Sequence, residues 1–166
     1  IRNCDWSSDV CSSDLSCYSD LTRTGCVSVT VPEHFTKVFR VVAAARDAGV
    51  ACVQAAFAAG RPVTGGEVDD AVRTVIEQAG YGQYFCHRTG HNLAQEVHGN
   101  GTHMDNLETC DTRRILPGTL FTIEPGIYLP EFGVRSEINV YIERAGGVRV
   151  TGGPLQTEVV PILGQF

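Results

Sequence analysis

Three of the five histidines fall within one twelve-residue segment, HRTGHNLAQEVH. They are His87, His91 and His98. A single histidine more often has a structural role than a chemical one, whereas three in so short a segment favour a site that binds a metal ion or moves protons. This segment is therefore the first candidate for chemistry.

Three acidic residues lie in strand-like sequence elsewhere in the chain. Glu124 stands in FTIEPGIY, Glu137 in GVRSEINVYI, and Asp20 in YSDLTRT at the end of an apolar-patterned stretch. A carboxylate in the middle of an apolar strand is costly to bury unless it is paired or coordinates a cation. Each acid taken alone fits a surface position on an edge strand, but the three together with a histidine predict a metal site.

The composition of this ligand set indicates which metals would suit it. One imidazole and three carboxylates form an oxygen-rich site, which fits Mn(II), Co(II), Zn(II) or Fe(II) better than a structural zinc that would recruit cysteines. Carboxylates that can bridge also favour two ions about 3.5–4 Å apart, as in two-metal hydrolases.

The elements that must position these side chains follow from residue patterns. Residues 18–31 alternate threonine and valine and predict a strand that ends in a turn. A long helix is expected to open at Val31-Pro32-Glu33 with Thr30 as its cap. Gly60-Arg61-Pro62 would end this helix.

A second helix is expected from Thr64 to about residue 79, with Glu67 completing a capping box. The apolar stripes would comprise Phe35, Val38, Phe39, Val42 and Ala43 in the first helix, and Val68, Val72, Val75 and Ile76 in the second. Short strands are expected around 120–128, 134–143, 147–151 and 157–163. Two helices followed by hairpin-linked strands indicate an α+β fold.

The bulk properties narrow the class of protein. A chain of 166 residues suits one domain, and its 43% hydrophobic and 19% charged residues are ordinary for a globular protein. The formal charge of −6 without a basic patch argues against nucleic acid as a partner. The sequence is not expected to contain an apolar run as long as the roughly 20 residues that a membrane span requires. Seven cysteines without a CxxC pair, and no secretory signal, predict a cytoplasmic protein.

The N-terminal string has a different character. Residues Asp5 to Leu15 read DWSSDVCSSDL, which resembles the one-frame translation of a common DNA-sequencing adapter. The string shows neither strand alternation nor a helical stripe. We therefore expect residues 1–15 to be foreign to the natural protein, the alternative being a genuine polar loop.

Four ordered blocks resemble the signatures of the M24 metallopeptidases, the family of methionine aminopeptidase, Xaa-Pro aminopeptidase and prolidase. The blocks are SDLTRT, HRTGH…EVH, FTIEPGIYLP and GVRSE. The intervening GNGTHMDNLETCDTRRILPGT is similar to a bacterial Xaa-Pro branch, so that the likeness covers about residues 17–163. It implies a pita-bread fold that is incomplete at its N-terminus, with residues 16–166 as the C-terminal part of the catalytic domain.

The resemblance also implies the metal ligands. Asp20 would be the second of the family's two metal-binding aspartates, and His91 the single imidazole ligand. Glu124 would be a carboxylate ligand beside the nucleophilic water, and Glu137 a second bridging carboxylate. Two divalent ions are expected there, with manganese favoured among manganese, cobalt, zinc and iron.

Catalytic roles are implied in the same way. Glu124 would take and return the proton of the attacking water, and His98 would stabilise the tetrahedral intermediate or shuttle a proton. His87 and Arg135 match positions that shape the proline-side pocket of the Xaa-Pro branch. Methionine aminopeptidases lack a histidine four residues before the ligand histidine, so His87 favours the proline-specific branch.

The sequence departs from the family pattern at three places. Ala94 stands where the family usually has glycine, and Ile138-Asn139 replaces a common acidic pair, a change that could retune metal affinity. The family's first aspartate often lies eleven residues before the second, where this chain has Asp9 inside the adapter-like string. We interpret that match as a coincidence, which leaves four of five ligands.

The expected function is therefore a metal-dependent exopeptidase acting on a peptide with a free N-terminus and proline in second position. A homodimer is expected from the family alone, without nucleic acid or membrane as partners. Two alternatives remain open: a creatinase-like amidinohydrolase without metal, and an inactive pita-bread module that binds a peptide or protein. A truncated chain would itself be inactive or weakly active.

Overall fold

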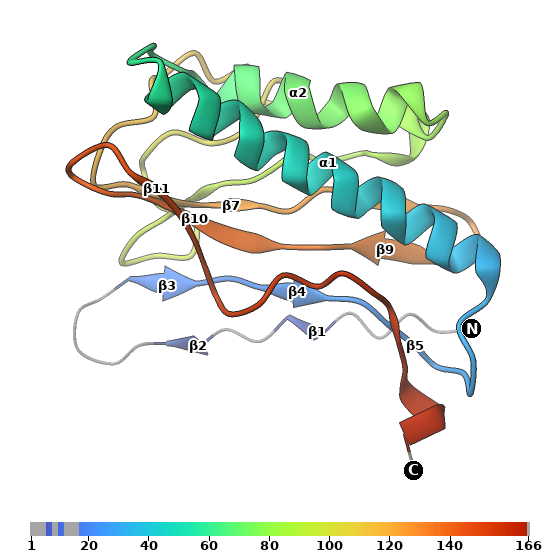
Figure 1. The fold of residues 1–166 in the computed structure, drawn as a ribbon. Helices are drawn as coiled ribbons and strands as arrows, with labels where there is room; N and C mark the ends of the chain where they lie inside the picture. The colour runs from blue at the N-terminus through green and yellow to red at the C-terminus, as the bar shows by residue number, and fades with distance from the viewer. Residues whose placement is uncertain (1–5, 8–9, 12–16, 166) are drawn as a thin grey trace.

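The computed structural model describes residues 6–7, 10–11 and 17–165. Two long helices, two short 3-10 helices and a set of short strands form the fold (Figure 1). The helices are α1 Glu33–Ala58, α2 Gly65–Gln78, η1 Gly82–Tyr84 and η2 Ile162–Gln165. The strands are β1 Trp6–Ser7, β2 Val10–Cys11, β3 Tyr18–Ser19, β4 Thr22–Arg23, β5 Gly25–Cys26, β6 Asn92–Leu93, β7 Leu120–Ile123, β8 Gly126–Tyr128, β9 Gly133–Arg135, β10 Ile138–Ile142, β11 Val148–Thr151 and β12 Val160–Pro161.

Helix α1 starts where the sequence predicts but is capped differently. The prediction of Thr30 as its cap is wrong, because Pro32 holds the N-cap position in an extended conformation without a side-chain hydrogen bond. The Pro32 carbonyl instead accepts the N–H groups of Phe35 and Thr36. Proline suits this position, since it has no N–H group that would need a partner. Gly60, at φ +63°, follows the helix end as expected.

Helix α2 has the predicted capping box. The Thr64 hydroxyl accepts the Glu67 N–H group, and the Glu67 carboxylate accepts the Thr64 N–H group at 2.8 Å. Its buried stripe comprises Val68, Val72 and Ile76, with Val75 half-buried. The capped first turn fixes where α2 begins, and the stripe fixes the face that it turns to the core.

The two helices lie together on one face of a four-stranded antiparallel sheet of order β11-β10-β7-β6 (Figure 1). In α1, Gly49 marks the close contact: a Cβ atom there would lie 2.7 Å from Val72 of α2 and 3.3 Å from Ile123 of β7. Phe121, Ile123, Val140 and Ile142 are all buried. The core therefore lies between the helices and this sheet.

The two predicted long strands are each broken in the middle. Residues 120–128 form β7 and β8, and residues 134–143 form β9 and β10. β7 pairs with β10 and β8 pairs with β9, so that the break at Glu124-Pro125 faces the break at Ser136-Glu137. The two acids thus stand at facing strand breaks rather than in mid-strand. Of the remaining predicted strands, 147–151 is confirmed as β11, while 157–163 contains only the short β12 and part of η2.

The predicted strand 18–31 is present as the short strands β3, β4 and β5, on the far side of the sheet from the helices (Figure 1). It is joined to the second strand break by hydrogen bonds. The Glu137 N–H group donates to the Thr22 carbonyl at 3.1 Å, and the Thr24 hydroxyl donates to the Arg135 carbonyl at 2.6 Å. These hydrogen bonds hold the SDLTRT block next to the strand break that contains Glu137.

Two sequence expectations need a further remark. By length and composition alone α1 could cross a membrane, contrary to the expected absence of such a run, although one face of it is packed in the core. Of the adapter-like string, the structure describes only β1 and β2, which pair with β4 and β3. The expected boundary at residues 15–16 and Asp9 lie outside the described residues.

Candidate metal centre

His91 is held in a buried position immediately before β6. Its N–H group donates to the Thr122 hydroxyl at 2.9 Å, and its carbonyl accepts the Thr122 N–H group at 2.9 Å. The preceding Gly90 makes this approach possible, because a Cβ atom there would lie 2.0 Å from the Thr122 carbonyl oxygen. The ring Nδ1 lies 3.3 Å from the Asn92 carbonyl oxygen, which leaves Nε2 to face the acids.

The four predicted ligands converge although they come from distant parts of the chain. The His91 Nε2 atom lies 3.5 Å from Asp20 Oδ2 and 3.4 Å from Glu124 Oε1. One donor atom each from Asp20, His91 and Glu137 all lie within 4.8 Å of one another. This spacing suits donor atoms around a cation better than a set of direct hydrogen bonds.

Glu124 is buried and is held by three neighbours. The Thr122 hydroxyl donates to Oε1 at 3.1 Å, Arg135 Nη1 lies 3.4 Å from Oε2, and the Glu124 N–H group donates to the Thr89 carbonyl at 2.7 Å. Burial raises the pKa of the Glu124 carboxyl, while the charges of His91 and Arg135 oppose that rise. The carboxyl group therefore has a fixed orientation and an increased affinity for a proton.

Glu137 is buried with one oxygen satisfied and one not. The Thr22 hydroxyl donates to Oε2 at 2.5 Å, whereas Oε1 has no hydrogen-bond partner among the described residues. Burial and the charge of nearby Glu124 raise the pKa of Glu137 to about 8. A buried carboxylate oxygen without a partner is costly, and a cation would remove that cost. These residues therefore fit a divalent metal.

Asp20 behaves in the opposite way. The hydrogen bond with His91 lowers the pKa of Asp20, against the effect of its partial burial. One carboxylate of the cluster is thus readily ionised, while two resist ionisation because they are buried near each other. A bound cation would favour the ionised form of all three, which couples metal binding to proton release.

Asn139 and Thr22 were not predicted as site residues, and they position the ligands. The Asn139 side chain donates to the Ser19 hydroxyl at 2.6 Å and accepts the Asp20 N–H group at 3.3 Å. Its place in the sequence, where the family often has an acid, had suggested a change in metal affinity rather than this backbone anchor. Thr22 lies two residues after Asp20 in a predicted strand, where side chains two residues apart point to the same face. This spacing could have indicated Thr22 as a residue of the site.

Two of the predicted catalytic residues border the cluster. The His98 ring meets the His91 ring edge-on, with 4.3 Å between centroids, and the pKa of His98 is lowered by its partial burial and by His91. His87 Nδ1 lies 2.7 Å from the Arg88 carbonyl oxygen, which can only accept, so His87 Nε2 accepts from the Tyr128 hydroxyl at 3.0 Å. Burial lowers the pKa of His87 and keeps its ring neutral.

The cluster opens into a cavity of about 270 Å³. Its lining includes six of the predicted site residues and the unpredicted Arg88 and Glu108; the full set is Asp20, His87, Arg88, His91, His98, Glu108, Glu124 and Arg135. Arg88 lies inside the histidine segment, whereas Glu108 comes from the long connection between β6 and β7 and has no sequence signal of its own. Glu137 is not among these lining residues.

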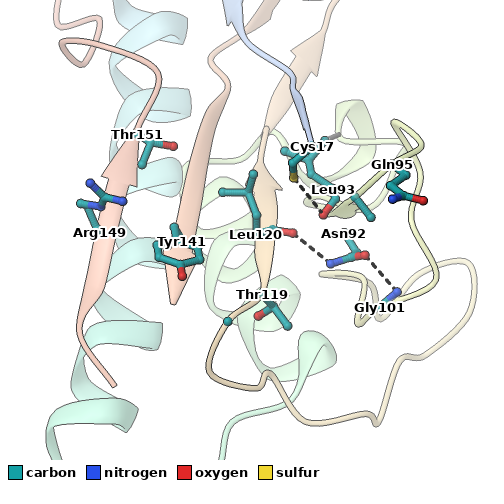
Figure 2. Close-up of a pocket in the computed structure, with 12 residues that line it drawn as sticks. Cys17, Asn92, Leu93, Gln95, Gly101, Thr119, Leu120, Tyr141, Arg149 and Thr151 are labelled. Carbon is teal, nitrogen blue, oxygen red and sulfur yellow. Dashed lines mark hydrogen bonds between the residues drawn. The ribbon is translucent and has the colours of Figure 1, made fainter. Parts of the chain in front are cut away.

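A second, larger cavity of about 680 Å³ lies over β6, β7, β10 and β11 (Figure 2). The Asn92 side chain organises one side of it, donating to the Leu120 carbonyl at 2.9 Å and accepting the Gly101 N–H group at 3.0 Å. None of the described residues that line it is acidic or a histidine, and the surface is mostly apolar. Of these two cavities, the smaller one is therefore the one whose lining contains acids and histidines that could bind a metal ion or transfer a proton.

Comparison with known proteins agrees with the geometry of the cluster. The model of a family described as metallopeptidase family M24 matches residues 9–144. The chain belongs to this family. An uncharacterized peptidase of Bacillus subtilis, YqhT, is 36% identical to the M24 chain over 155 residues, which is 89% of this chain and 40% of that protein. A Xaa-Pro dipeptidase of Pyrococcus furiosus is 35% identical over 135 residues, covering 80% of this chain and 35% of that protein.

Solved structures give the same result for the fold. A prolidase from Thermococcus sibiricus superposes with a TM-score of 0.76 at 30% identity over 94% of this chain. A Xaa-Pro dipeptidase from Bacillus anthracis superposes with a TM-score of 0.71 at 30% identity over 87% of it. Each alignment covers 38% of the other chain, so the M24 chain spans less than half the length of these relatives. It has part of a pita-bread fold, as the resemblance implied.

Proposed function

We propose that the M24 chain is part of a metal-dependent exopeptidase that cleaves the amide bond after an N-terminal residue, with proline preferred in second position. One observation carries the proposal: an imidazole and three carboxylates from distant segments form one cluster beside the cavity, with a buried Glu137 oxygen that lacks a hydrogen-bond partner among the described residues. The printed names of the relatives, Xaa-Pro dipeptidase and prolidase, support the substrate class.

Asp20, His91, Glu124 and Glu137 would hold two divalent ions, with manganese favoured. When bound, such ions would lower the pKa of a water molecule and polarise the carbonyl group of the substrate. The oxygen-rich donor set supports this choice, since carboxylates and one imidazole suit harder divalent metals. The raised pKa values of Glu124 and Glu137 support the need for a cation, because both carboxyl groups resist ionisation without one.

Glu124 would act as the general base. Its Oε1 atom lies 3.4 Å from His91 Nε2 and is fixed by the Thr122 hydroxyl, so one carboxylate edge is held towards the ligands. A buried carboxyl group with an increased proton affinity is suited to take a proton from water and to return it to the leaving amine.

His98 would donate a hydrogen bond to the oxygen that gains charge during attack. Its contact with the His91 ring places it beside the cluster, and its lowered pKa favours a neutral ring that still carries one N–H group. His87, held by Tyr128, and Arg135, held by Glu124, would shape the wall that receives the proline.

A direct test is Mn(II)-dependent hydrolysis of L-alanyl-L-proline, with EDTA as the metal-free control. Glu124→Gln should abolish turnover. Glu143→Gln is the control and should leave turnover unchanged, because the Glu143 side chain is exposed and forms an ion pair only with Arg149 among the described residues. Creatine hydrolysis in EDTA would instead favour the metal-free amidinohydrolase. Peptide binding without any metal-dependent turnover would favour the binding module.

Three features of the whole protein remain part of the proposal. Five cysteines of the described chain are free thiols, which supports a reducing, cytoplasmic location. A homodimer is expected from the family. Reading the source DNA upstream of Tyr18 tests the N-terminal segment: an aspartate on a natural preceding strand would complete a fifth ligand, whereas confirmation of DWSSDVCSSDL would make Asp9 that candidate.

A further inference from the structure

Asp69, in helix α2, is a fully buried carboxylate that accepts four hydrogen bonds. Its Oδ1 atom accepts the Thr89 N–H group at 2.9 Å, and its Oδ2 atom accepts the Asn106 N–H group at 3.1 Å. Arg73, one turn further along α2, supplies the other two, from Nη2 to Oδ1 at 3.0 Å and from Nε to Oδ2 at 3.1 Å. Each carboxylate oxygen thus has two donors, which offsets the cost of burying the charge.

Arg73 completes the contact of α2 with the histidine segment. Its Nη2 atom also donates to the His87 carbonyl at 3.0 Å, and its Nη1 atom donates to the Phe85 carbonyl at 3.1 Å. The guanidinium group lies over the Phe85 ring, 4.3 Å from its centroid, and that ring meets the His87 ring edge-on. The two α2 side chains therefore bind the backbone at Phe85, His87 and Thr89, the stretch that leads to the predicted metal ligand His91.

The Thr89 peptide connects Asp69 to the predicted general base. Its N–H group donates to Asp69, and its carbonyl accepts the Glu124 N–H group at 2.7 Å. The Thr89 side chain does not anchor this peptide, because its buried hydroxyl has no hydrogen-bond partner among the described residues. The backbone hydrogen bonds to Asp69 and Glu124 therefore fix its place, and a shift on one side would be passed to the other.

We infer that Asp69, held by Arg73, is a positioning residue for the metal centre, which fixes the Thr89 peptide and through it the places of His91 and Glu124. The inference rests on the proposed metal-dependent function and assigns to α2 a part in the geometry of that site. Neither Asp69 nor Arg73 is among the residues that line the metal cavity. Hydrogen bonds that orient metal ligands from behind change metal affinity by about 10–100-fold when they are removed.

The test is Asp69→Asn, which keeps the shape of the side chain but replaces one acceptor oxygen by an NH2 group. Whichever way the amide is turned, two of the four donors then face another donor, and Arg73 loses its counter-charge. Calorimetry measures the affinity of the folded protein for Co(II), and the visible absorption of the bound ion reports the geometry of its ligands. The variant should bind Co(II) about 10–100-fold more weakly, with an altered spectrum. Arg73→Lys keeps a positive charge beside Asp69 and should bind Co(II) more tightly than Asp69→Asn does.

Thr64→Ala is the matched control in the same helix. It removes the hydroxyl of the capping box, which should lower the thermal unfolding midpoint, while the contacts of that side chain are with Glu67 and not with the metal cluster. Its Co(II) affinity and spectrum should equal those of the native protein. If Asp69→Asn also lowers the midpoint but binds Co(II) like the native protein, Asp69 only stabilises the fold and the inference is wrong. If Asp69→Asn fails to fold, the double variant with Arg73→Met, which removes the unpaired charge, decides by the same measurement.

A measurement without metal separates this inference from the proposed function. In EDTA, amide hydrogen exchange at Glu124 reports its hydrogen bond to the Thr89 carbonyl. Asp69→Asn should speed this exchange relative to that of the Ile142 amide, which bonds elsewhere in the sheet, and Thr64→Ala should not. If the native protein binds no metal but the exchange changes as expected, the peptidase proposal fails and the positioning role remains. If the native protein binds Co(II) and Asp69→Asn changes neither its affinity nor the Glu124 exchange, the metal centre is supported and the role of Asp69 is refuted.

Discussion

Replacing Glu137 by glutamine is expected to stabilise the metal-free protein and to remove its binding of divalent ions. The amide has the shape of the carboxyl group, and its oxygen can still accept the hydrogen bond from Thr22, which is 2.5 Å long with the native residue. Because the amide carries no charge, it avoids the cost of burial and the repulsion by Glu124 that the carboxylate suffers. The same loss of charge removes a metal ligand.

The pKa of Glu137 sets the size of the gain in stability. Burial first, and then Glu124, raise this pKa from 4.5 to about 8. Between these values the unfolded chain has released a proton that the folded chain retains, so stability falls as the pH rises from about 4.5 to about 8 and is constant above. At about 1.36 kcal/mol for each pKa unit, the loss reaches up to about 3 kcal/mol near pH 7. Glu137→Gln should recover that amount.

Urea unfolding in EDTA at pH 5, 7 and 9 measures the effect. The advantage of Glu137→Gln over the native protein should be small at pH 5 and largest at pH 9, while Glu143→Gln, on an exposed side chain, should show no such trend. Manganese at about 100 times its Kd should add about 2.7 kcal/mol to the native protein and nothing to Glu137→Gln. A variant that is less stable than the native protein at every pH would refute the reasoning.

Three other substitutions test one residue of the surrounding fold and two residues that position the metal ligands. Burial would raise the pKa of Asp111, but hydrogen bonds from Arg113 and from backbone N–H groups hold it at about 2. Its stabilising effect is present above pH 3.8 and is lost as the pH falls towards 2, so Asp111→Asn should cost about 1–3 kcal/mol in urea unfolding at pH 7 and little at pH 2. Gly90→Ala places a Cβ atom 2.0 Å from the Thr122 carbonyl and should lower the thermal unfolding midpoint by several degrees; an unchanged midpoint would contradict the contact. Thr22→Val removes the hydroxyl that orients the Glu137 carboxylate and should weaken manganese binding, measured by calorimetry, about 10–100-fold. An unchanged affinity for manganese would contradict this role of Thr22.

Local chemistry explains which parts of the fold could be predicted. The capping box of Thr64 and Glu67 and the stripe of Val68, Val72 and Ile76 depend on neighbours three and four residues away, and they define α2 in the structure as in the sequence. The α1 cap failed because threonine and proline both suit a helix start, and only the path of the preceding chain decides between them.

The two strand breaks, within residues 120–128 and 134–143, were not predicted from the alternation of apolar residues. The alternation of apolar residues favours one strand through Glu124 and another through Glu137, although Pro125-Gly126 is itself a signal of a break after Glu124. In the structure the two breaks face each other, and this brings the acids together. Facing breaks depend on the pairing register of two strands, which a single chain segment does not encode by itself.

The sequence alone determined that this chain has a histidine and three acids suited to binding a metal ion, and that they lie within the sequence blocks of the M24 family. Chemistry at that level needs only the identity of the side chains and their place along the chain. The tertiary structure decided the rest: that Glu137 keeps a buried oxygen without a partner, that Asn139 anchors Asp20, and that Arg88 faces the cavity with one distant partner. These properties depend on burial and on distances between segments up to 119 residues apart, which only the folded chain defines.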